Sequence, residues 1–274
     1  MSTTDQTESI ALDTLSSELG DVVHIDSESI HKASFDGLKV SFSPSAVIRP
    51  EESSQVGTVL RLANEFCIPV TTKGAGSSLT GGATPVQGGW VLDVSLLNQI
   101  EIDVDNQIAR CGPGAIVADI QDDADEHNLF YPPDPSSKMF CTIGGNIACN
   151  AGGLRCVKYG VTRDYILSLS GYLPTGEAVQ WGRATRKFAT GYNIRDLWIG
   201  SEGTLGIVTE AVLRLVGKPV SQKTFLAAFR SDKDALRAPI ELSRIGIRPS
   251  ILEFLDRWTV ECVQSFTGKE VFHG

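Results

Sequence analysis

A short loop over residues 72–82 carries four glycines, at positions 74, 76, 81 and 82. Glycine lets a ligand approach the backbone closely, and it lets successive N–H groups turn inward as an anion-binding nest. Ser77, Ser78 and Thr80 lie among these glycines and add hydroxyl donors that suit phosphate oxygens. The combination predicts a loop that binds a phosphorylated ligand mainly through its main chain.

The loop matches neither of two familiar phosphate-binding motifs. The dinucleotide fingerprint needs glycine at its first, third and sixth positions and a helix directly after it, but the sixth position counted from Gly74 is Leu79. A Walker A loop needs lysine and a hydroxyl residue after its last glycine, whereas Gly82 and Ala83 follow Gly81. A surface turn of small residues stays an alternative, because glycine clusters most often mark turns.

The surrounding pattern places the loop directly after a strand. Apolar residues at helical spacing from Val56 to Phe66 predict a helix, which residues 49–52 open with proline and acids. A short strand over residues 68–72 leads into the loop, and residues 90–94 predict the next strand. Further strands are expected near residues 46–48, 100–102, 108–111, 166–173, 178–181 and 207–216, and a helix over residues 117–124.

Two more segments rich in small residues follow. Residues 131–153 begin with three prolines and continue with glycines and two asparagines, and they show no evident regular structure. A loop of this length is usually functional or disordered, and its aromatic residues argue against disorder. A tight packing corner is the alternative reading of the same small residues. The third cluster, residues 200–206, runs into the strand expected from residue 207.

The two ends of the chain give weaker patterns. Residues up to about Glu8 resemble a loose tail, and residues 10–19 predict a short helix. Near the other end the pattern predicts a strand over residues 224–229, a helix that Ser231 caps, and a strand that begins over residues 251–255.

Composition excludes several classes of protein. The 274 residues carry a net charge of −9, which argues against a nucleic-acid partner or an anionic membrane surface. The six cysteines form no C-x-x-C pair, so we expect reduced thiols and neither a metal site nor a disulfide framework. The polar N-terminus and the lack of a long apolar run predict no signal peptide and no membrane span, and a cytoplasmic location.

The ordered set of motifs resembles one family of FAD-linked oxidases, the vanillyl-alcohol oxidase and p-cresol methylhydroxylase type. Within that family it is most similar to the FAD subunit of glycolate oxidase and to D-lactate dehydrogenases. The resemblance covers roughly residues 46–255. The matching segments are Arg49–Pro50, Lys73–Gly76, Gly81–Gly82, Phe130–Ser137, Thr142–Gly153, Lys158–Asp164, Gly191–Tyr192 and Gly200–Thr209.

The resemblance implies an α+β fold, with a two-lobed FAD-binding domain of the p-cresol methylhydroxylase type followed by the start of an α+β cap domain. We assign residues 1–45 to an N-terminal segment and residues 46–218 to the FAD-binding domain, with lobes of about 46–111 and 112–218. Residues 219–274 would be an incomplete cap.

The resemblance also implies how FAD, the expected cofactor, would be held. The pyrophosphate would be bound by the first loop, namely Lys73, Gly74, Ala75, Gly76, Ser77, Ser78, Gly81 and Gly82. The flavin edge would be lined by Pro133, Asp134, Pro135 and Ser136. The isoalloxazine and ribityl chain would lie beside Thr142, Gly145, Asn146, Asn150, Gly152 and Gly153, with Tyr159 and Gly160 closing that side. The adenosine and ribityl portion would be reached by Glu202, Gly203 and Ile207.

We expect this FAD to be bound without a covalent bond. Some members of the family link the flavin to a histidine in the first loop, but Ser77 occupies that position here, which excludes such a link. Cys141 and Cys149 lie near the second segment, where a cysteinyl link is the alternative, yet a buried inert thiol is the commoner state.

The resemblance implies a dehydrogenase or oxidase that passes a hydride from a D-2-hydroxy acid, such as glycolate or D-lactate, to the flavin. Related enzymes place a histidine-rich cluster in the cap, but residues 219–274 contain only His273, so we name no catalytic residue. The chain would supply the FAD-binding part of a longer or split enzyme, with a partner subunit or a further C-terminal half. The alternatives are an FAD-binding module without turnover and a reductase similar to the UDP-N-acetylmuramate family, against which residues 132–137 argue.

Overall fold

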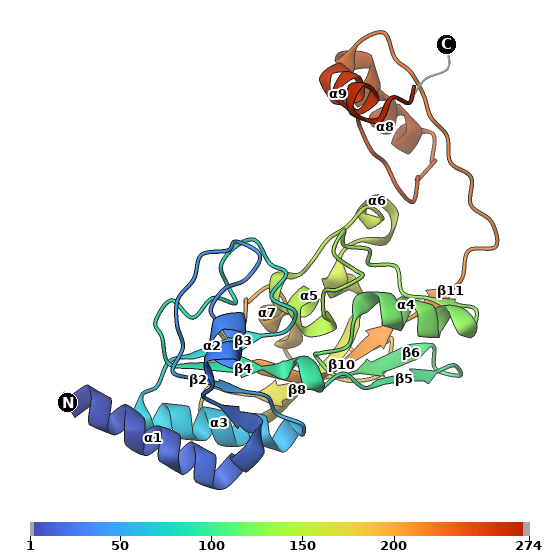
Figure 1. Cartoon of the computed structure of the whole chain (residues 1–274). Coiled ribbons are helices and arrows are strands. Elements are labelled where there is room, and N and C mark those ends of the chain that lie inside the picture. The colour runs from blue at the N-terminus through green and yellow to red at the C-terminus, as the bar shows by residue number, and fades with distance from the viewer. Residues whose placement is uncertain (1–2, 271–274) are drawn as a thin grey trace.

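Two large β-sheets and one two-stranded sheet, with helices around them, form the part of the protein that precedes residue 219 (Figure 1). The structure is a computed structural model that describes residues 3–270. The combination of helices with separate sheets confirms the predicted α+β class. The sheets lie side by side, and the glycine-rich segments meet between them.

The first sheet has the order β1-β2-β4-β3. Its strands are β1 (Val23–His24), β2 (Ala46–Ile48), β3 (Val70–Lys73) and β4 (Trp90–Asp93). Strands β2, β4 and β3 are parallel, whereas β1 pairs antiparallel with β2. All three residues of β2 are buried, as a strand covered on both faces requires.

Helices cover both faces of this sheet. On one face, α1 (Thr3–Leu19) and α3 (Ser53–Phe66) pack Leu15 and Val56 against Trp90. On the other face lies the short α2 (Ser27–Ala33), with Ala33 packed on Val47 and Val91. The predicted loose tail is therefore largely helical, because the buried Ala11 and Leu15 anchor α1 and its polar first turns continue the same helix.

The second sheet is antiparallel and has the order β5-β6-β10-β8-β9. Its strands are β5 (Ile100–Asp103), β6 (Ile108–Cys111), β8 (Ile166–Tyr172), β9 (Ala178–Gly182) and β10 (Ile207–Arg214). We predicted a lobe boundary near residue 111, but β5 and β6 pair with β10 and so belong to the second sheet. Residues 1–45, predicted as a separate segment, supply β1 and two helices to the first sheet.

Short helices and turns complete the two lobes. The helices are α4 (Val117–Glu126), α5 (Ile143–Cys149), α6 (Cys156–Tyr159) and α7 (Arg195–Trp198). The 3₁₀ turns are η1 (Gly20–Val22), η2 (Val94–Leu96) and η3 (Thr162–Tyr165), and β7 (Leu129–Phe130) pairs with β11 (Val216–Gly217). Ile120 and Ile147 enter one core with Leu169, which joins α4 and α5 to the sheet.

The C-terminal part consists of α8 (Asp232–Arg244) and α9 (Arg257–Thr267), which stand apart from the sheets at the end of an extended segment (Figure 1). The predicted strands over residues 224–229 and 251–255 do not form. A strand needs a neighbour for its backbone hydrogen bonds, and the described residues offer none there. His273 lies outside the described residues.

Candidate functional site

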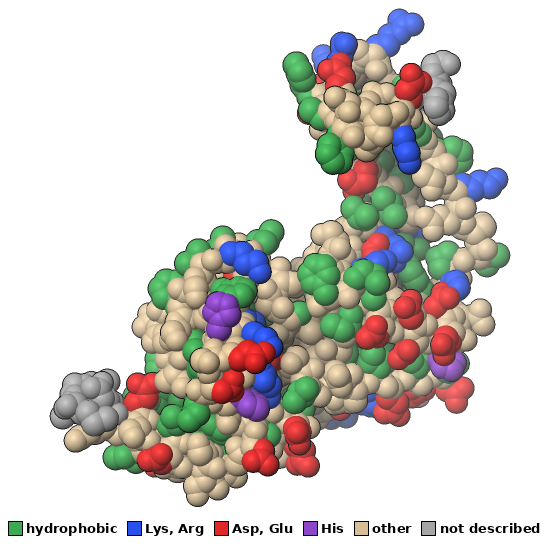
Figure 2. Space-filling model, viewed as in Figure 1, with side chains coloured by type: hydrophobic (Ala, Val, Ile, Leu, Met, Phe, Trp, Pro, Cys, Tyr) green, Lys and Arg blue, Asp and Glu red, His purple; other side chains and the backbone are tan. Residues whose placement is uncertain are grey.

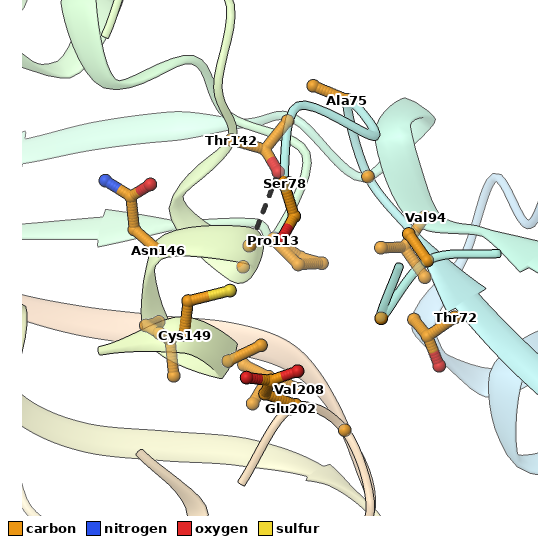
Figure 3. A pocket seen from close by; sticks show the side chains of 18 of the residues that line it. Thr72, Ala75, Ser78, Val94, Pro113, Thr142, Asn146, Cys149, Glu202 and Val208 are labelled. Atoms are coloured by element: carbon orange, nitrogen blue, oxygen red, sulfur yellow. Dashed lines mark hydrogen bonds between the residues drawn. The ribbon is translucent and has the colours of Figure 1, made fainter. Parts of the chain in front are cut away.

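A crevice of about 270 Å³ lies between the two sheets, and the three glycine-rich segments meet around it (Figure 3). Its walls come from the loop after β3, from α5 with the residues just before it, and from the segment that leads into β10. Segments about seventy and sixty residues apart in the chain thus build one site. Among the described residues that line the crevice, Glu202 is the only one with a charged side chain.

The loop after β3 presents backbone donors. No hydrogen bond within the described residues uses the N–H groups of Ala75, Gly76, Ser77 or Ser78. Gly76 has a φ of +61°, a left-handed conformation that glycine adopts freely. Consecutive free N–H groups around such a residue form the kind of nest that binds an anion.

Helix α5 forms the facing wall, although the sequence predicted an irregular loop there. Thr142 caps this helix, because its Oγ1 accepts a hydrogen bond from the Gly145 N–H at 3.4 Å. Gly144 fits directly against Pro113, where a Cβ would lie 2.7 Å from the proline Cβ. A Cβ on Gly74 would collide with the Thr142 hydroxyl, so the first loop needs glycine there to approach the facing wall this closely.

One polar side chain of α5 has an unmet donor. Asn146 lines the crevice, its side chain is only 4% exposed, and its Nδ2 has no hydrogen-bond partner in the structure. A buried donor without an acceptor costs about 1–3 kcal/mol. Such an orphan at the wall of a crevice indicates that a ligand acceptor completes it.

The third wall is fixed to the second by main-chain hydrogen bonds. The Gly200 N–H donates to the Ile147 carbonyl at 2.9 Å, and the Glu202 N–H donates to the Ala148 carbonyl at 2.9 Å. The Glu202 carboxylate reaches across to the first loop, where a Cβ on Gly82 would lie 3.0 Å from its Oε2. The three segments therefore form one interlocked rim.

Two thiols also line the crevice. Burial raises the pKa of Cys141, and burial followed by the charge of Glu202 raises the pKa of Cys149. A raised pKa keeps both groups protonated near neutral pH, which makes them poor nucleophiles.

The structure brings together about half of the predicted site residues. The predicted residues that line the crevice are Gly74, Ala75, Gly76, Ser77, Ser78, Gly82, Thr142, Gly145, Asn146, Glu202, Gly203 and Ile207. All three predicted segments contribute, so the convergence on which the prediction depends is present in the fold.

The other predicted residues do not line this crevice. They are Lys73, Gly81, Pro133, Asp134, Pro135, Ser136, Asn150, Gly152, Gly153, Tyr159 and Gly160. Asp134 is buried and pairs with Lys138 at 3.0 Å and Arg155 at 3.4 Å. Asn150 accepts a hydrogen bond from the Arg163 N–H at 3.0 Å. The polar side chains of Asp134 and Asn150 are thus bonded to neighbouring parts of the protein.

Sequence reasoning missed part of the lining. The additional residues are Thr72, Ala83, Val94, Pro113, Ser137, Cys141, Gly144, Ile147, Ala148, Cys149, Ala151, Trp198, Ser201, Gly206 and Val208. Most lie beside predicted residues, so a wider margin around each motif would have included them. Val94, Pro113 and Trp198 stand outside the motifs, and only the fold reveals them.

The described residues hold neither a metal-binding cluster nor a helix that could cross a membrane. No cluster of three or more histidine, cysteine, aspartate or glutamate side chains is arranged to hold a metal ion there. None of the helices in that part of the chain is both long and apolar enough to cross a bilayer.

Comparison with known protein families gives one match. A family model described as an FAD binding domain matches residues 44–182, which is about half of the chain and includes the loop after β3 and helix α5.

Curated relatives agree with this match. The chain is 42% identical over 224 residues to glycolate oxidase subunit GlcD of Bacillus subtilis, covering 81% of this chain and 48% of that protein. It is 38% identical over 230 residues to a D-lactate dehydrogenase of Anaerostipes hadrus, covering 84% and 48%. The chain spans about half the length of the curated relatives it matches.

Solved structures share the fold. An alkyldihydroxyacetonephosphate synthase superposes with a TM-score of 0.75 at 23% identity, covering 89% of this chain and 47% of that one. A 6-hydroxy-D-nicotine oxidase from Arthrobacter nicotinovorans superposes with a TM-score of 0.59 at 27% identity, covering 71% and 42%.

Proposed function

Since the chain belongs to the family of FAD-binding domains, with FAD as its cofactor, we propose that the crevice between the two sheets is the FAD site. The observation that carries this proposal is the row of free N–H groups from Ala75 to Ser78, which faces a wall with the unpartnered Nδ2 of Asn146. Neutral dipoles of this kind can hold a diphosphate in a protein of net charge −9.

The chemistry of each wall suggests which part of the cofactor it holds. The nest at Gly76 would take the pyrophosphate, and Asn146 would donate to an acceptor of the flavin or ribityl portion. Glu202 would repel phosphate, so its carboxylate suits the hydroxyl donors of a sugar. We infer non-covalent binding, because Cys141 and Cys149 are protonated thiols and Ser77 occupies the position of the histidine link.

For the whole protein, we infer an FAD-dependent dehydrogenase or oxidase of D-2-hydroxy acids such as glycolate or D-lactate. Support comes from relatives named glycolate oxidase subunit and D-lactate dehydrogenase. Bound FAD supplies the acceptor for a hydride, while the residues of this chain bind and orient it. The alternative is an FAD module without turnover that needs a partner subunit or a further C-terminal half for catalysis. The six free cysteines suit a cytoplasmic location.

The decisive experiment is purification followed by absorbance spectroscopy and dye reduction. We expect a yellow protein whose FAD is released on acid denaturation. Reduction of the dye with glycolate, D-lactate or D-2-hydroxyglutarate would rule out the passive module. A colourless protein that takes up no added FAD would contradict the proposed site, whereas bound FAD without turnover would favour the alternative.

A variant at Asn146 separates ligand binding from folding. Asn146→Leu removes a buried donor without a partner, so we expect unchanged or higher stability of the FAD-free protein and weaker FAD binding. The matched control is Asn64→Leu, because Asn64 lies on α3 outside this crevice. Equal losses of stability and FAD affinity in the Asn146 variant would show that the side chain serves the fold.

A further inference from the structure

A segment between α2 and β2 covers the outer side of the glycine loop. This strap, residues 34–44, approaches the loop closely at Gly37, where a Cβ would lie 2.6 Å from the Ser78 carbonyl oxygen and 3.1 Å from that of Ser77. Next to it, a Cβ on Gly81 would lie 3.5 Å from a methyl group of Leu38. The strap is therefore packed against the face of the loop that is turned away from the crevice.

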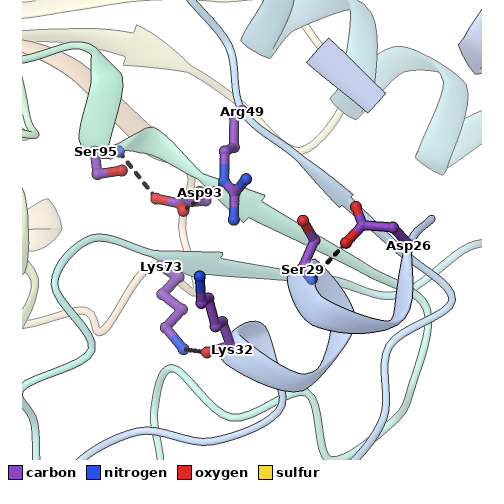
Figure 4. Close-up of polar contacts among 7 residues, drawn as sticks. All are labelled: Asp26, Ser29, Lys32, Arg49, Lys73, Asp93 and Ser95. Carbon is purple, nitrogen blue, oxygen red and sulfur yellow. Dashed lines mark hydrogen bonds and ion pairs between the residues drawn. The ribbon is translucent and has the colours of Figure 1, made fainter. Parts of the chain in front are cut away.

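Lys73 reaches from the end of β3 to the last turn of α2, where the strap begins (Figure 4). It is the last residue of β3 and directly precedes the loop, but its side chain does not enter the crevice. Its Nζ donates to the Lys32 carbonyl at 2.9 Å and to the Phe35 carbonyl at 2.7 Å, and it lies 5.7 Å from the centre of the Phe35 ring. The ammonium thus binds the last turn of α2 and the start of the strap.

The charges around Lys73 favour this position over one at a phosphate. Burial lowers the pKa of Lys73, and the nearby charge of Lys39 lowers it as well. Asp93, its partner in the β3–β4 register, and the buried Asp36 of the strap oppose this shift and favour the ammonium. Asp93 also pairs with Arg49 at 3.4 Å, which holds it at the end of the sheet. The ammonium therefore lies near two carboxylates on the side away from the nest.

The contact at Gly37 fixes the direction of two N–H groups of the loop. In a trans peptide the carbonyl of one residue and the N–H of the next point to opposite sides. The carbonyls of Ser77 and Ser78 face Gly37, so the N–H groups of Ser78 and Leu79 point away from the strap. Ser77 and Ser78 line the crevice on that side.

We propose that Lys73 is a positioning residue: its ammonium fastens the strap against the back of the glycine loop, and the strap holds the free N–H group of Ser78 toward the crevice. The residue does not bind the phosphate itself. This inference rests on the proposed FAD site, because it explains how the donors of that site keep their orientation without a ligand.

The first test compares Lys73→Gln with Lys218→Gln in the full chain, using ADP and FAD as ligands. Both changes remove one positive charge, but Lys218 pairs with Asp125 far from the strap. We expect Lys73→Gln to weaken ADP and FAD binding by about tenfold, with the same dependence on salt as the wild type, and Lys218→Gln to leave both affinities unchanged. A loss that comes with a smaller salt dependence would reveal a direct phosphate contact and overturn the proposal.

The second test measures amide hydrogen exchange in the strap of the ligand-free protein. In amide hydrogen exchange, Lys73→Gln should speed exchange by about tenfold at the strap donors Leu38 and Phe42, which bond to Asp36 and Ser34. Unchanged exchange there would overturn the proposal even if the wild type bound no FAD, so this result is independent of the proposed function. Failure of the wild type to bind ADP or FAD would instead count against the site.

A third variant keeps Lys73 in place. Gly37→Ala puts a Cβ against the Ser78 carbonyl, so the strap must move away from the loop. We expect weaker ADP binding, by about tenfold, together with faster exchange in the loop. If Gly37→Ala had the ADP affinity and hydrogen exchange of the wild type, the proposal would be overturned. This test can be carried out even if Lys73→Gln fails to fold.

Discussion

Residues 3–218 and residues 219–270 differ in what they bury. The first part has two large apolar cores, one with Trp90 and one with Leu169, and a small third cluster under α2. In the described residues of α8 and α9 no side chain is buried, and Trp258 and Phe266 are 76% and 92% exposed. Hydrophobic side chains lie on the visible surface of this part of the molecule (Figure 2). Every residue that lines the crevice lies between 72 and 208.

The difference shows where binding and stability reside. The part with two cores holds the crevice in shape by its own packing, because each wall is tied to a sheet. Helices α8 and α9 gain little from packing, and short helices without packing are marginal in water. The apolar side chains of these helices are left uncovered, and none of their described residues lines the crevice.

The largest expected effect follows from truncating a core side chain. Leu169→Ala in β8 should destabilise the protein by about 2–5 kcal/mol, since it opens a cavity in a fully packed core. Leu255→Ala in the C-terminal part, where the side chain is 52% exposed, should change stability by less than about 0.5 kcal/mol. Urea denaturation measures both, and similar losses would break the comparison.

A smaller effect is expected from adding a methyl group. Gly153→Ala would push a Cβ into the Asp134 backbone carbonyl, and backbone cannot turn aside as a side chain can. We expect a loss of about 1–3 kcal/mol. Gly217→Ala is the matched control, because a Cβ there meets no atom within 4 Å. Thermal unfolding distinguishes them, and a Gly153 variant as stable as the control would mean that this wall can shift.

A pH dependence should mark the buried thiol of Cys111. Burial, followed by the charges of Asp123 and Glu210, raises the pKa of Cys111 to about 12. Above about pH 8.5 the unfolded chain loses this proton while the folded chain keeps it, so stability falls by about 1.4 kcal/mol per pH unit. Denaturation at pH 8 and pH 10 should show a shallower fall for Cys111→Ala. Cys262→Ala, which removes an exposed thiol of α9, should keep the wild-type slope.

The smallest effect is expected from removing the C-terminal part. A chain ending at residue 218 should bind FAD with unchanged affinity and melt within about 2 °C of the full chain, because none of the described residues of α8 and α9 is buried. Isothermal titration with FAD and thermal scans test this. A large loss of affinity on truncation would assign part of the binding to residues beyond 218.

Local patterns predicted much of the fold where burial and periodicity agree. Strand β2 and the hairpin of β8 and β9 were predicted nearly to the residue, since their apolar residues are bounded by turns. Helix α5 was missed because Gly144, Gly145 and Asn146 are weak helix formers. Its helical form depends on the Thr142 cap and on packing against Pro113, which no local pattern encodes.

The site divides in the same way. Glycine spacing indicated the nest at Gly76, because a left-handed backbone favours glycine and such positions can be recognised in the sequence. The direction of a long side chain cannot be recognised from the sequence in this way. Lys73 was predicted within the phosphate loop, yet its side chain reaches back to the Phe35 carbonyl. Val94 and Trp198 enter the crevice from segments without a motif, so only the pairing of the sheets could place them.

The strand order of the second sheet has a consequence for synthesis. β10 lies between β6 and β8, although it is the last of the five strands to leave the ribosome. The first sheet has all its strands once residue 93 has emerged, whereas β6 and β8 lack their common neighbour until residue 214 follows. For more than a hundred residues of translation, the nascent chain therefore exposes strand edges that a chaperone would have to shield.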